Sequence, residues 1–262
     1  MSLLQEVLDL DIAYLDTFTN RINTTWGYMF YDEKQPNYYD ANHAHISQIP
    51  HNPKSIIEEV IHFYQEKNIP PRFYIYNYEK QFNLIEALTS YHFQVELLVS
   101  PVQKWNRQLN EQKENNKVSI EKVTEANYEE ALNIECSISE FGGKEVREIA
   151  FSKEFHHPSF TQYILRYEGE ACSTACLFQH GNQIRLESVA TKEKFRGKGL
   201  IGELIYFLQK EVRNRNINDF WVFPINEKIE KVYSKYGFET IGKFTTAHAF
   251  LEGKSIKEIQ GI

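Results

Sequence analysis

The order of strand-like and helix-like apolar patterns is the strongest restriction on the fold of this 262-residue chain. From residue 118 onward the two kinds of pattern alternate, with short turns between them. Strands are predicted at 118–123, 162–167, 170–179, 183–191 and 220–223, with further strands from 238 to 253, and helices at 125–139, 144–155, 200–213 and 226–237. This alternation predicts an α/β fold built on a mixed sheet.

Part of this order occurs twice in the chain. Residues 44–93 run strand, helix, strand, helix and lead into another strand, and residues 188–238 do the same at similar spacing. The repeat favours a duplicated fold: a smaller α/β domain at 1–102, an exposed polar connector at 103–117 and a second domain at 118–262. The alternative is that any chain of alternating strands and helices resembles itself at this level of detail.

Acidic residues are concentrated in the N-terminal part of the chain. The formal net charge is −7, and residues 1–102 hold 13 acidic and 6 basic residues, so the remainder is neutral. This charge argues against a nucleic-acid partner, which needs a basic surface. A small anionic ligand is compatible with the neutral part, where Lys192, Lys194, Arg196 and Lys198 cluster.

The chain shows no pattern typical of a membrane or secreted protein. No apolar run approaches the length of a membrane span, and the N-terminus carries acidic residues where a secretion signal needs basic ones. Cys136, Cys172 and Cys176 are an odd number in mostly apolar sequence, which favours buried free thiols over disulfides or a zinc site. We therefore expect a cytoplasmic protein with no metal and no membrane partner.

A short basic loop, RGKG at residues 196–199, comes directly before the helix predicted at 200–213. A helix start exposes unpaired N–H groups and the positive end of the helix dipole, and glycines allow a phosphate to approach the backbone closely. The alternative is a plain tight turn, and the spacing is not that of a P-loop. In the N-terminal copy HNPK at 51–54 takes this place, and Pro53 lacks an N–H, so no equivalent phosphate site is expected there.

Two segments together resemble the GNAT superfamily of acetyl-CoA-dependent N-acetyltransferases. The family's cofactor loop reads Arg/Gln-x-x-Gly-x-Gly/Ala after a strand that often ends in Val-Ala-Thr, and a later helix starts at Asn and leads to Tyr-x-x-x-Gly-Phe. Here SVATKEKFRGKGLIG and NEKIEKVYSKYGF supply the matching residues Val189, Ala190, Thr191, Arg196, Gly199, Asn226, Tyr233, Gly237 and Phe238. The resemblance implies a GNAT fold in the C-terminal domain and a degenerate GNAT-like copy at 1–102.

The resemblance also implies where acetyl-CoA, the cosubstrate, would bind. It would lie between the strands 183–191 and 219–223, with its diphosphate on the N–H groups of residues 197–202. The implied cofactor-binding residues are Val189, Ala190, Thr191, Arg196, Gly197, Lys198, Gly199, Leu200, Ile201, Gly202 and Asn226. The family pattern ends in Gly or Ala, whereas this chain has Ile201 there and Gly202 one position later. We therefore expect weaker diphosphate binding or a helix start shifted by one residue.

Tyr233 and Glu187 are the candidate catalytic residues. Tyr233 stands where the family places the general acid for the CoA thiolate; the reference pKa values are about 10 for a phenol and about 8.5 for a thiol, which favours a hydrogen bond over full proton transfer. The alternative for Tyr233 is packing on the apolar face of its helix. Glu187 is the candidate base, and strand alternation predicts that it shares a face with Val189 and Thr191. An ion pair of Glu187 with a nearby Lys or Arg, a role for Glu140, and a water molecule as base are the alternatives.

Two histidine pairs are candidates for metal binding, but neither has a third ligand in view. His43 and His45 share a predicted strand face, and His156 and His157 are adjacent. We expect solvated or hydrogen-bonded histidines at all four positions.

The patterns favour an N-acetyltransferase that acts on a primary amine of a small molecule or peptide. The alternatives are a CoA-binding regulatory or interaction protein without turnover and a general nucleotide or phosphate binder. The N-terminal domain is expected to shape the acceptor site or an interface, and its acidity favours a cationic acceptor. The sequence does not determine the acceptor, the acyl-chain preference or whether the protein is a homodimer.

Overall fold

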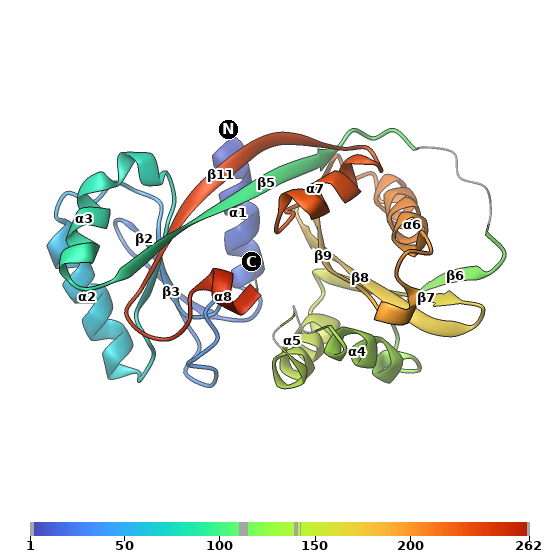
Figure 1. Cartoon of the computed structure of the whole chain (residues 1–262), viewed down its shortest axis with the longest axis horizontal. Coiled ribbons are helices and arrows are strands. Elements are labelled where there is room, and N and C mark those ends of the chain that lie inside the picture. The colour runs from blue at the N-terminus through green and yellow to red at the C-terminus, as the bar shows by residue number, and fades with distance from the viewer. Residues whose placement is uncertain (1–2, 110–114, 139–140, 142, 261–262) are drawn as a thin grey trace. The chain divides into compact units, whose positions relative to one another are not determined.

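The computed structural model describes residues 3–109, 115–138, 141 and 143–260 (Figure 1). Contacts divide the chain into two compact units, unit 1 with residues 1–100 and 243–262 and unit 2 with residues 101–242. The elements up to β5 are α1 (Leu3–Leu15), β1 (Asn20–Asn23), β2 (Gly27–Tyr31), β3 (His43–Ile46), α2 (Pro53–Glu66), β4 (Arg72–Ile75), η1 (Tyr78–Lys80), α3 (Phe82–Ser90) and β5 (Gln94–Trp105). The later elements are β6 (Val118–Lys122), α4 (Tyr128–Cys136), α5 (Lys144–His156), β7 (Phe160–Tyr167), β8 (Glu170–His180), β9 (Gln183–Thr191), η3 (Glu193–Phe195), α6 (Leu200–Asn214), β10 (Asp219–Val222), α7 (Glu227–Ser234), β11 (Phe238–Phe250) and α8 (Ile256–Gln260).

Within the described residues, eleven strands form a mixed sheet in the order β1-β2-β3-β4-β11-β5-β10-β9-β8-β7-β6. The boundary between the units falls inside β5 and β11, so each of these strands contributes to both units. The predicted α/β class with a mixed sheet is confirmed.

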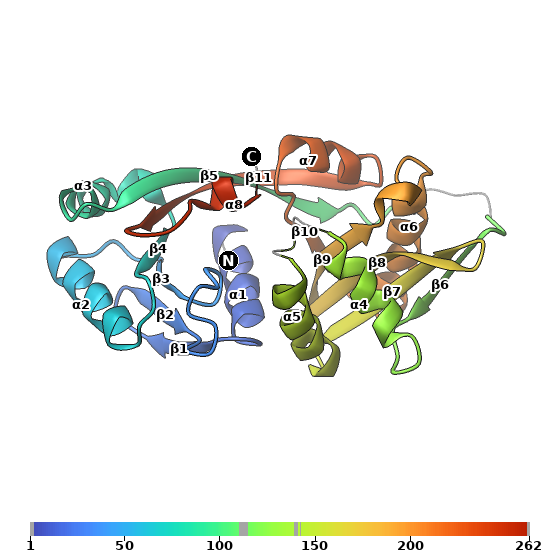
Figure 2. The ribbon, with the colours of Figure 1, turned by 60° about the horizontal axis from the view of Figure 1, so that its bottom comes forward.

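Helices cover both faces of the strands in unit 2. The amphipathic helix α6 lies on one face of β7, β8 and β9, and α4 and α5 lie on the other (Figure 1, Figure 2). Leu208 of α6 and Leu186 of β9 belong to the first core, and Phe151 of α5 and Ile164 of β7 to the second. Each such buried side chain contributes about 1.5–3 kcal/mol of hydrophobic stabilisation.

Unit 1 repeats this arrangement on a smaller scale. Val60 of α2 and Leu88 of α3 pack with Phe73 of β4 on one face of the strands. On the opposite face, Leu15 of α1 packs with Phe30 of β2. The sequence patterns predicted α2 and α3 but not α1, β1 and β2, because residues 3–31 have no counterpart in the repeated segment.

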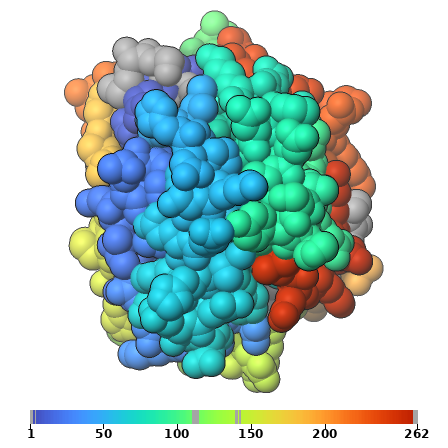
Figure 3. All heavy atoms as spheres, turned by 90° about the vertical axis from the view of Figure 1, so that its left-hand side faces the viewer, coloured from blue at the N-terminus to red at the C-terminus, as the bar shows by residue number. Residues whose placement is uncertain are grey.

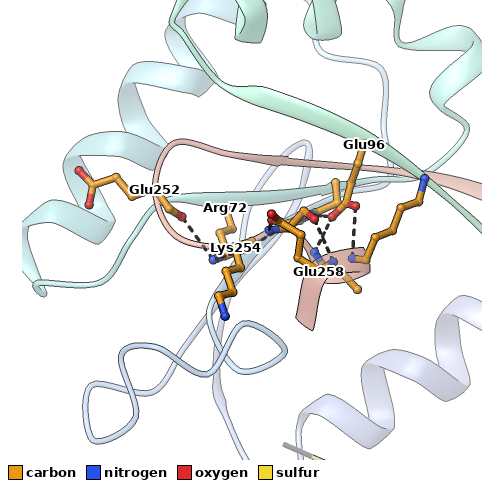
Figure 4. Close-up of polar contacts among 9 residues, drawn as sticks. Arg72, Glu96, Glu252, Lys254 and Glu258 are labelled. Atoms are coloured by element: carbon orange, nitrogen blue, oxygen red, sulfur yellow. Dashed lines mark hydrogen bonds and ion pairs between the residues drawn. The ribbon is translucent and has the colours of Figure 1, made fainter. Parts of the chain in front are cut away.

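The C-terminal residues return to unit 1, which differs from the predicted domain at 118–262. β11 is one continuous strand, whereas separate strands were predicted, and its second half pairs with β4. Glu96 of β5 accepts a hydrogen bond from the N–H of Ile256 at 2.7 Å, and Arg72 donates to the carbonyls of Glu252 and Lys254 at 3.4 Å (Figure 4). Figure 3 shows the dark red C-terminal segment against the green residues of unit 1. Strand periodicity predicts that these residues are extended but not which strand they pair with.

The predicted connector begins later than residue 103, because β5 continues to Trp105. The side chain of Gln103 is fully buried and donates hydrogen bonds to Ser234 Oγ at 2.9 Å and to the carbonyl of Glu230 at 3.2 Å. Trp105 packs edge-on against Phe220 in the core. The amide NH₂ of Gln103 thus has acceptors on α7, whereas its Oε1 has no hydrogen-bond partner among the described residues.

Candidate active site

The start of α6 leaves a row of backbone N–H groups unpaired. Gly197 and Gly199 have φ values of +79° and +76°, a left-handed conformation that favours glycine. Gly199 occupies the N-cap position, and no side chain caps the helix. Among the described residues, the N–H groups of 197–201 have no hydrogen-bond partner, whereas the N–H of Gly202 donates to the carbonyl of Gly199 at 2.9 Å. The open row therefore ends at residue 201 and not, as predicted, at 202.

Ile201 and Gly202 have separate packing roles at this helix start. The Ile201 side chain packs against the core under α6. A Cβ on Gly202 would lie 2.7–2.9 Å from atoms of the Tyr236 ring and hydroxyl, so Gly202 provides room for that ring. The helix begins at Leu200, as predicted, and the N–H of Ile201 remains unpaired.

Basic side chains surround the row of N–H groups. Arg196 is exposed, and its Nε donates to the carbonyl of Thr191 at 3.1 Å. The Lys198 ammonium lies 5.1 Å from the centre of the Tyr167 ring. Unpaired N–H groups, the positive helix end and two cations together form a site that suits an anionic group such as a diphosphate.

A β-bulge in β9 contradicts the predicted face of Glu187. Glu187 pairs with Cys176 of β8, but Ala190 pairs with Thr174, so the register shifts between them. Ser188 has φ +47°, and the extra residue reverses the alternation. Glu187 therefore lies on the α4–α5 face of the strand, opposite to Val189, which packs against the core under α6.

β9 and β10 separate beyond their first residues. Their parallel pairing covers three positions and ends at Trp221 and Arg185, and the next residue of β10, Val222, pairs with Gln103 of β5. The segment from Glu187 to Ala190 therefore has strand neighbours on one side only. At the end of β9, the carbonyl of Thr191 accepts the Arg196 hydrogen bond, and the Thr191 hydroxyl lies 2.8 Å from Ser173 Oγ.

Tyr233 is buried, and the charge of Glu187 acts on its pKa. The side chain belongs to the core of unit 2, with its ring edge-on to Phe238 at 5.8 Å. Burial raises the pKa of Tyr233, and the Glu187 carboxylate raises it further, so the phenol is protonated at neutral pH. In the described part of the chain its hydroxyl makes no hydrogen bond, which leaves it able to donate one to a ligand.

Glu187 forms an ion pair with the Nε of Arg185, two residues earlier on the strand. Arg185 is buried, and its guanidinium lies 5.1 Å from the centre of the Phe223 ring. The carboxylate is half-buried, with 24% of its side chain exposed, so a bound molecule could still contact it. The structure thus shows the ion pair that the sequence left as an alternative.

Asn226 forms the N-cap of α7. Its Oδ1 accepts a hydrogen bond from the N–H of Ile229 at 3.0 Å, which fixes the side chain. The amide NH₂ has no partner among the described residues and could donate to a ligand.

A buried ionic cluster on the α4–α5 face was not predicted. Arg147 of α5 forms ion pairs with Glu135 of α4 and with Glu154, and Gln162 Nε2 donates to Glu154 at 3.3 Å. Glu135 is fully buried; the loss of water raises its pKa to about 8, and the Glu154 charge adds to this although Arg147 opposes it. Two carboxylates on one guanidinium therefore retain one proton at neutral pH. The available sequence signal was a Glu within the apolar stripe of a helix, at the same helical phase as Ala131 and Ile138.

The histidine predictions divide between the units. His156 Nδ1 lies 2.8 Å from the carbonyl of Ser152, and His157 Nδ1 accepts the N–H of Ser159 at 3.2 Å, as expected for hydrogen-bonded histidines. His45 is fully buried and neither ring nitrogen has a hydrogen-bond partner among the described atoms, so the prediction is wrong there.

Further predictions concern metal binding, membranes and Glu140. Glu140 lies outside the described residues. No cluster of three or more His, Cys, Asp or Glu residues able to hold a metal occurs in the described ranges. None of the helices in those ranges is long and apolar enough to cross a membrane. Cys172 and Cys176 are buried free thiols, and Cys136 is half-buried.

Comparison with known proteins identifies the fold and family of unit 2. The profile of the acetyltransferase (GNAT) family matches residues 127–238, which include the α6 start, the β9 bulge and Tyr233. This segment is a GNAT acetyltransferase domain. Acetyl-CoA is the usual cosubstrate of the GNAT family. No protein with a curated description matches the chain.

Solved structures extend the likeness beyond the GNAT domain. A GCN5-related N-acetyltransferase from Kribbella flavida has a TM-score of 0.70 at 14% identity, covering 98% of this chain and 99% of that chain. A functionally unknown conserved protein from Staphylococcus epidermidis has a TM-score of 0.69 at 13% identity, covering 89% of this chain and 94% of that chain. A GCN5-related N-acetyltransferase from Sphaerobacter thermophilus has a TM-score of 0.55 at 12% identity, covering 77% of this chain and 68% of that chain. The predicted GNAT fold is confirmed.

Proposed function

We propose that the GNAT domain transfers an acetyl group from acetyl-CoA to a primary amine of a small molecule or peptide. The open row of N–H groups at residues 197–201 carries this proposal. A diphosphate fits there because the glycines leave space beside the backbone and no Asp or Glu lies within the loop from 196 to 202.

The residues around this row would hold the rest of the cosubstrate. Bound acetyl-CoA supplies the acetyl thioester, to which an amine adds with release of the CoA thiol. The backbone of Val189 and Ala190 is positioned to align the thioester arm, because these residues have strand neighbours on one side only. The amide NH₂ of Asn226 can donate to the same arm.

Tyr233 would stabilise the leaving sulfur. Its raised pKa keeps the phenol protonated, which favours a hydrogen bond to the thiolate over complete proton transfer. Glu187, whose charge acts on the pKa of Tyr233, is the candidate acceptor of the proton from the attacking amine, directly or through water. The acidity of residues 1–102, with 13 acidic and 6 basic residues, favours a cationic acceptor.

Substitution of Tyr233 by Phe tests the assignment of the general acid. Turnover should fall by about tenfold to a hundredfold, because a hydrogen bond to the leaving group is lost. CoA affinity should change little, and Tyr206→Phe on α6 should leave both unchanged. Full turnover in Tyr233→Phe would remove this role. The acceptor is found by incubating the protein with acetyl-CoA and an amine library and identifying products by mass spectrometry.

A second candidate is a CoA-binding protein without turnover. The Arg185–Glu187 ion pair favours it, because a paired carboxylate is a weaker base. Thermal stabilisation by acetyl-CoA without thiol release across the amine library would support this function. Equal stabilisation by ATP and CoA would instead favour a general phosphate binder.

We also propose that unit 1 is a degenerate GNAT-like copy that does not bind the cosubstrate. The start of α2 supports this, since Asn52 Oδ1 accepts the N–H of Ser55 at 3.3 Å and Pro53 has no N–H. CoA titration of Asn52→Ala and Asn226→Ala tests this proposal, because only Asn226→Ala should weaken CoA binding.

A further inference from the structure

Unit 1 contains a pocket beside the start of α2, with a volume of about 580 Å³. Its walls come from the turn between β1 and β2, the segment between β3 and α2, and the first two turns of α2. Its lining includes Trp26, Ile49, Pro50, Asn52, Ile56 and Glu59. All belong to unit 1, so the pocket does not depend on any other part of the chain.

Backbone contacts fix the two loops that form the pocket. The carbonyl of Trp26 accepts the N–H groups of Ser47 and Gln48 at 3.3 and 3.2 Å. The Nε2 of the buried Gln81 donates a hydrogen bond to the carbonyl of Gln48 at 3.1 Å. At Gly27 a Cβ would lie 1.9 Å from the carbonyl oxygen of His45, so only glycine permits this close approach of β2 to β3. The pocket is therefore largely preformed.

Two titratable side chains line the pocket, the exposed Glu59 and the exposed His51, and the carboxylate of Glu59 suits a cation. Glu59 carries the only carboxylate in the lining, and its Oε2 accepts the Trp26 indole N–H at 3.3 Å. The other carboxylate oxygen has no partner among the described residues. At the helix start, Pro53 has no N–H and the N–H of Ser55 is occupied by Asn52, so little remains to hold an anion.

The apolar part of the wall consists of Trp26, Ile49, Pro50 and Ile56, and the other lining residues are polar. Trp26 is almost fully buried, with 4% of its surface exposed, whereas Ile49 is 58% exposed. Covering Ile49 with an apolar group would remove that surface from water, which is favourable. A carboxylate beside an aromatic wall is also a favourable site for an ammonium group.

We propose that this pocket binds a small primary amine with an apolar or aromatic body, its ammonium group on Glu59 and its body against Trp26, Ile49 and Ile56. This is a second ligand site, in unit 1, and it does not rest on acetyl transfer in unit 2.

Titration with phenethylamine, followed through the indole N–H signals of ¹⁵N-labelled protein, tests the proposal. The chain has three tryptophans, and Trp105 and Trp221 lie in unit 2. The Trp26 signal should shift and saturate whether or not the amine is also an acetylation substrate. The uncharged analogue 2-phenylethanol should bind about tenfold more weakly, since it lacks the charge-assisted contact.

Glu59→Gln keeps an acceptor for the Trp26 indole but removes the charge. It should weaken phenethylamine binding by about tenfold, while Glu66→Gln, on the same helix but outside the pocket, should not change it. No saturable shift of Trp26, equal affinity for 2-phenylethanol, or unchanged affinity in Glu59→Gln would each overturn the proposal.

Discussion

The helices α2 and α6 occupy the same position in the repeated strand–helix order, but their first turns are chemically opposite. The α2 start is closed: Asn52 caps it and Pro53 removes an N–H. The α6 start is open, because Gly199 occupies the cap position and five N–H groups remain unpaired. The residues at the helix start, HNPK at 51–54 and RGKG at 196–199, therefore determine whether this shared fold offers an anion site.

The buried polar groups of the two units differ as well. Unit 1 buries imidazoles: burial lowers the pKa of His45 to about 4, although the Asp11 charge opposes the shift, so the ring is neutral at pH 7. Unit 2 buries the ionic cluster of Glu135, Arg147 and Glu154, which holds a proton at neutral pH. The two units should therefore respond to pH in opposite directions.

The largest expected effect comes from closing the open helix start. Gly199→Asp keeps the left-handed backbone accessible, since Asp tolerates it better than most residues, but places a negative charge on the diphosphate site. The Kd for CoA should rise about a hundredfold, or about 2.7 kcal/mol, in a calorimetric titration. Gly181→Asp, at a left-handed glycine in the turn between β8 and β9, is the matched control and should not change the Kd. Equal affinity in both variants would contradict the proposed site.

Loss of stability in unit 2 with rising pH is the next effect. Between pH 5 and 7 unfolded Glu135 is already largely ionised, with a reference pKa of about 4.3, whereas the folded state keeps its proton until about pH 8, so the free energy of unfolding falls as pH rises. The loss should be about 2.5 kcal/mol in the wild type and nearly absent in Glu135→Gln, measured by hydrogen exchange of α4. Glu129→Gln, an exposed carboxylate on the same helix, should keep the wild-type pH dependence. A pH dependence retained in Glu135→Gln would show that the proton resides elsewhere.

Unit 1 should instead lose stability in acid. Below about pH 6.5 unfolded His45 binds a proton that the folded state excludes until about pH 4, so the free energy of unfolding falls by about 1.4 kcal/mol between pH 7.5 and 5.5. His45→Phe should reduce this loss, and its ring can retain the stacking on Tyr76, now 4.4 Å between centres. Hydrogen exchange of β3 reports the effect. The exposed His62, changed to Gln, serves as control, and an equal reduction there would refute the assignment to His45.

The smallest effect on the free energy of unfolding is expected from substitutions of two capping asparagines. Asn52 and Asn226 each accept an N–H at a helix start, so Asn52→Ala and Asn226→Ala should each lower the free energy of unfolding by about 1 kcal/mol. Only Asn226→Ala should also weaken CoA binding, because its free NH₂ is the proposed donor to the ligand. A similar change in CoA affinity for both variants would remove the distinction between the units.

Much of the fold follows from local sequence patterns. The strand at 183–191 and the start of α6 at Leu200 agree with the prediction, because periodicity and the glycine loop are local signals. The strands predicted at 162–167 and 170–179 leave Glu168 and Gly169 as the turn, and their φ values of +51° and +84° are those that a two-residue hairpin requires. The open α6 start, which carries the proposed function, could likewise be predicted from residues 196–200.

The remaining features depend on contacts between distant residues. The bulge at Ser188 moved Glu187 to the opposite face, and alternation alone gives no signal for an inserted residue. The pairing of β11 with β4 joins segments that are far apart in sequence, and the buried amide NH₂ of Gln103 donates to Ser234 of the distant α7. The cluster around Arg147 forms through side-chain contacts between α4 and α5. Strand and helix periods do not specify such partners.

A crystal structure of the protein with bound CoA would locate the diphosphate. We expect diphosphate oxygens at hydrogen-bond distance, about 3 Å, from the N–H groups of residues 197–201, with no phosphate at the start of α2. A diphosphate bound elsewhere, with those N–H groups still unpaired, would contradict this expectation.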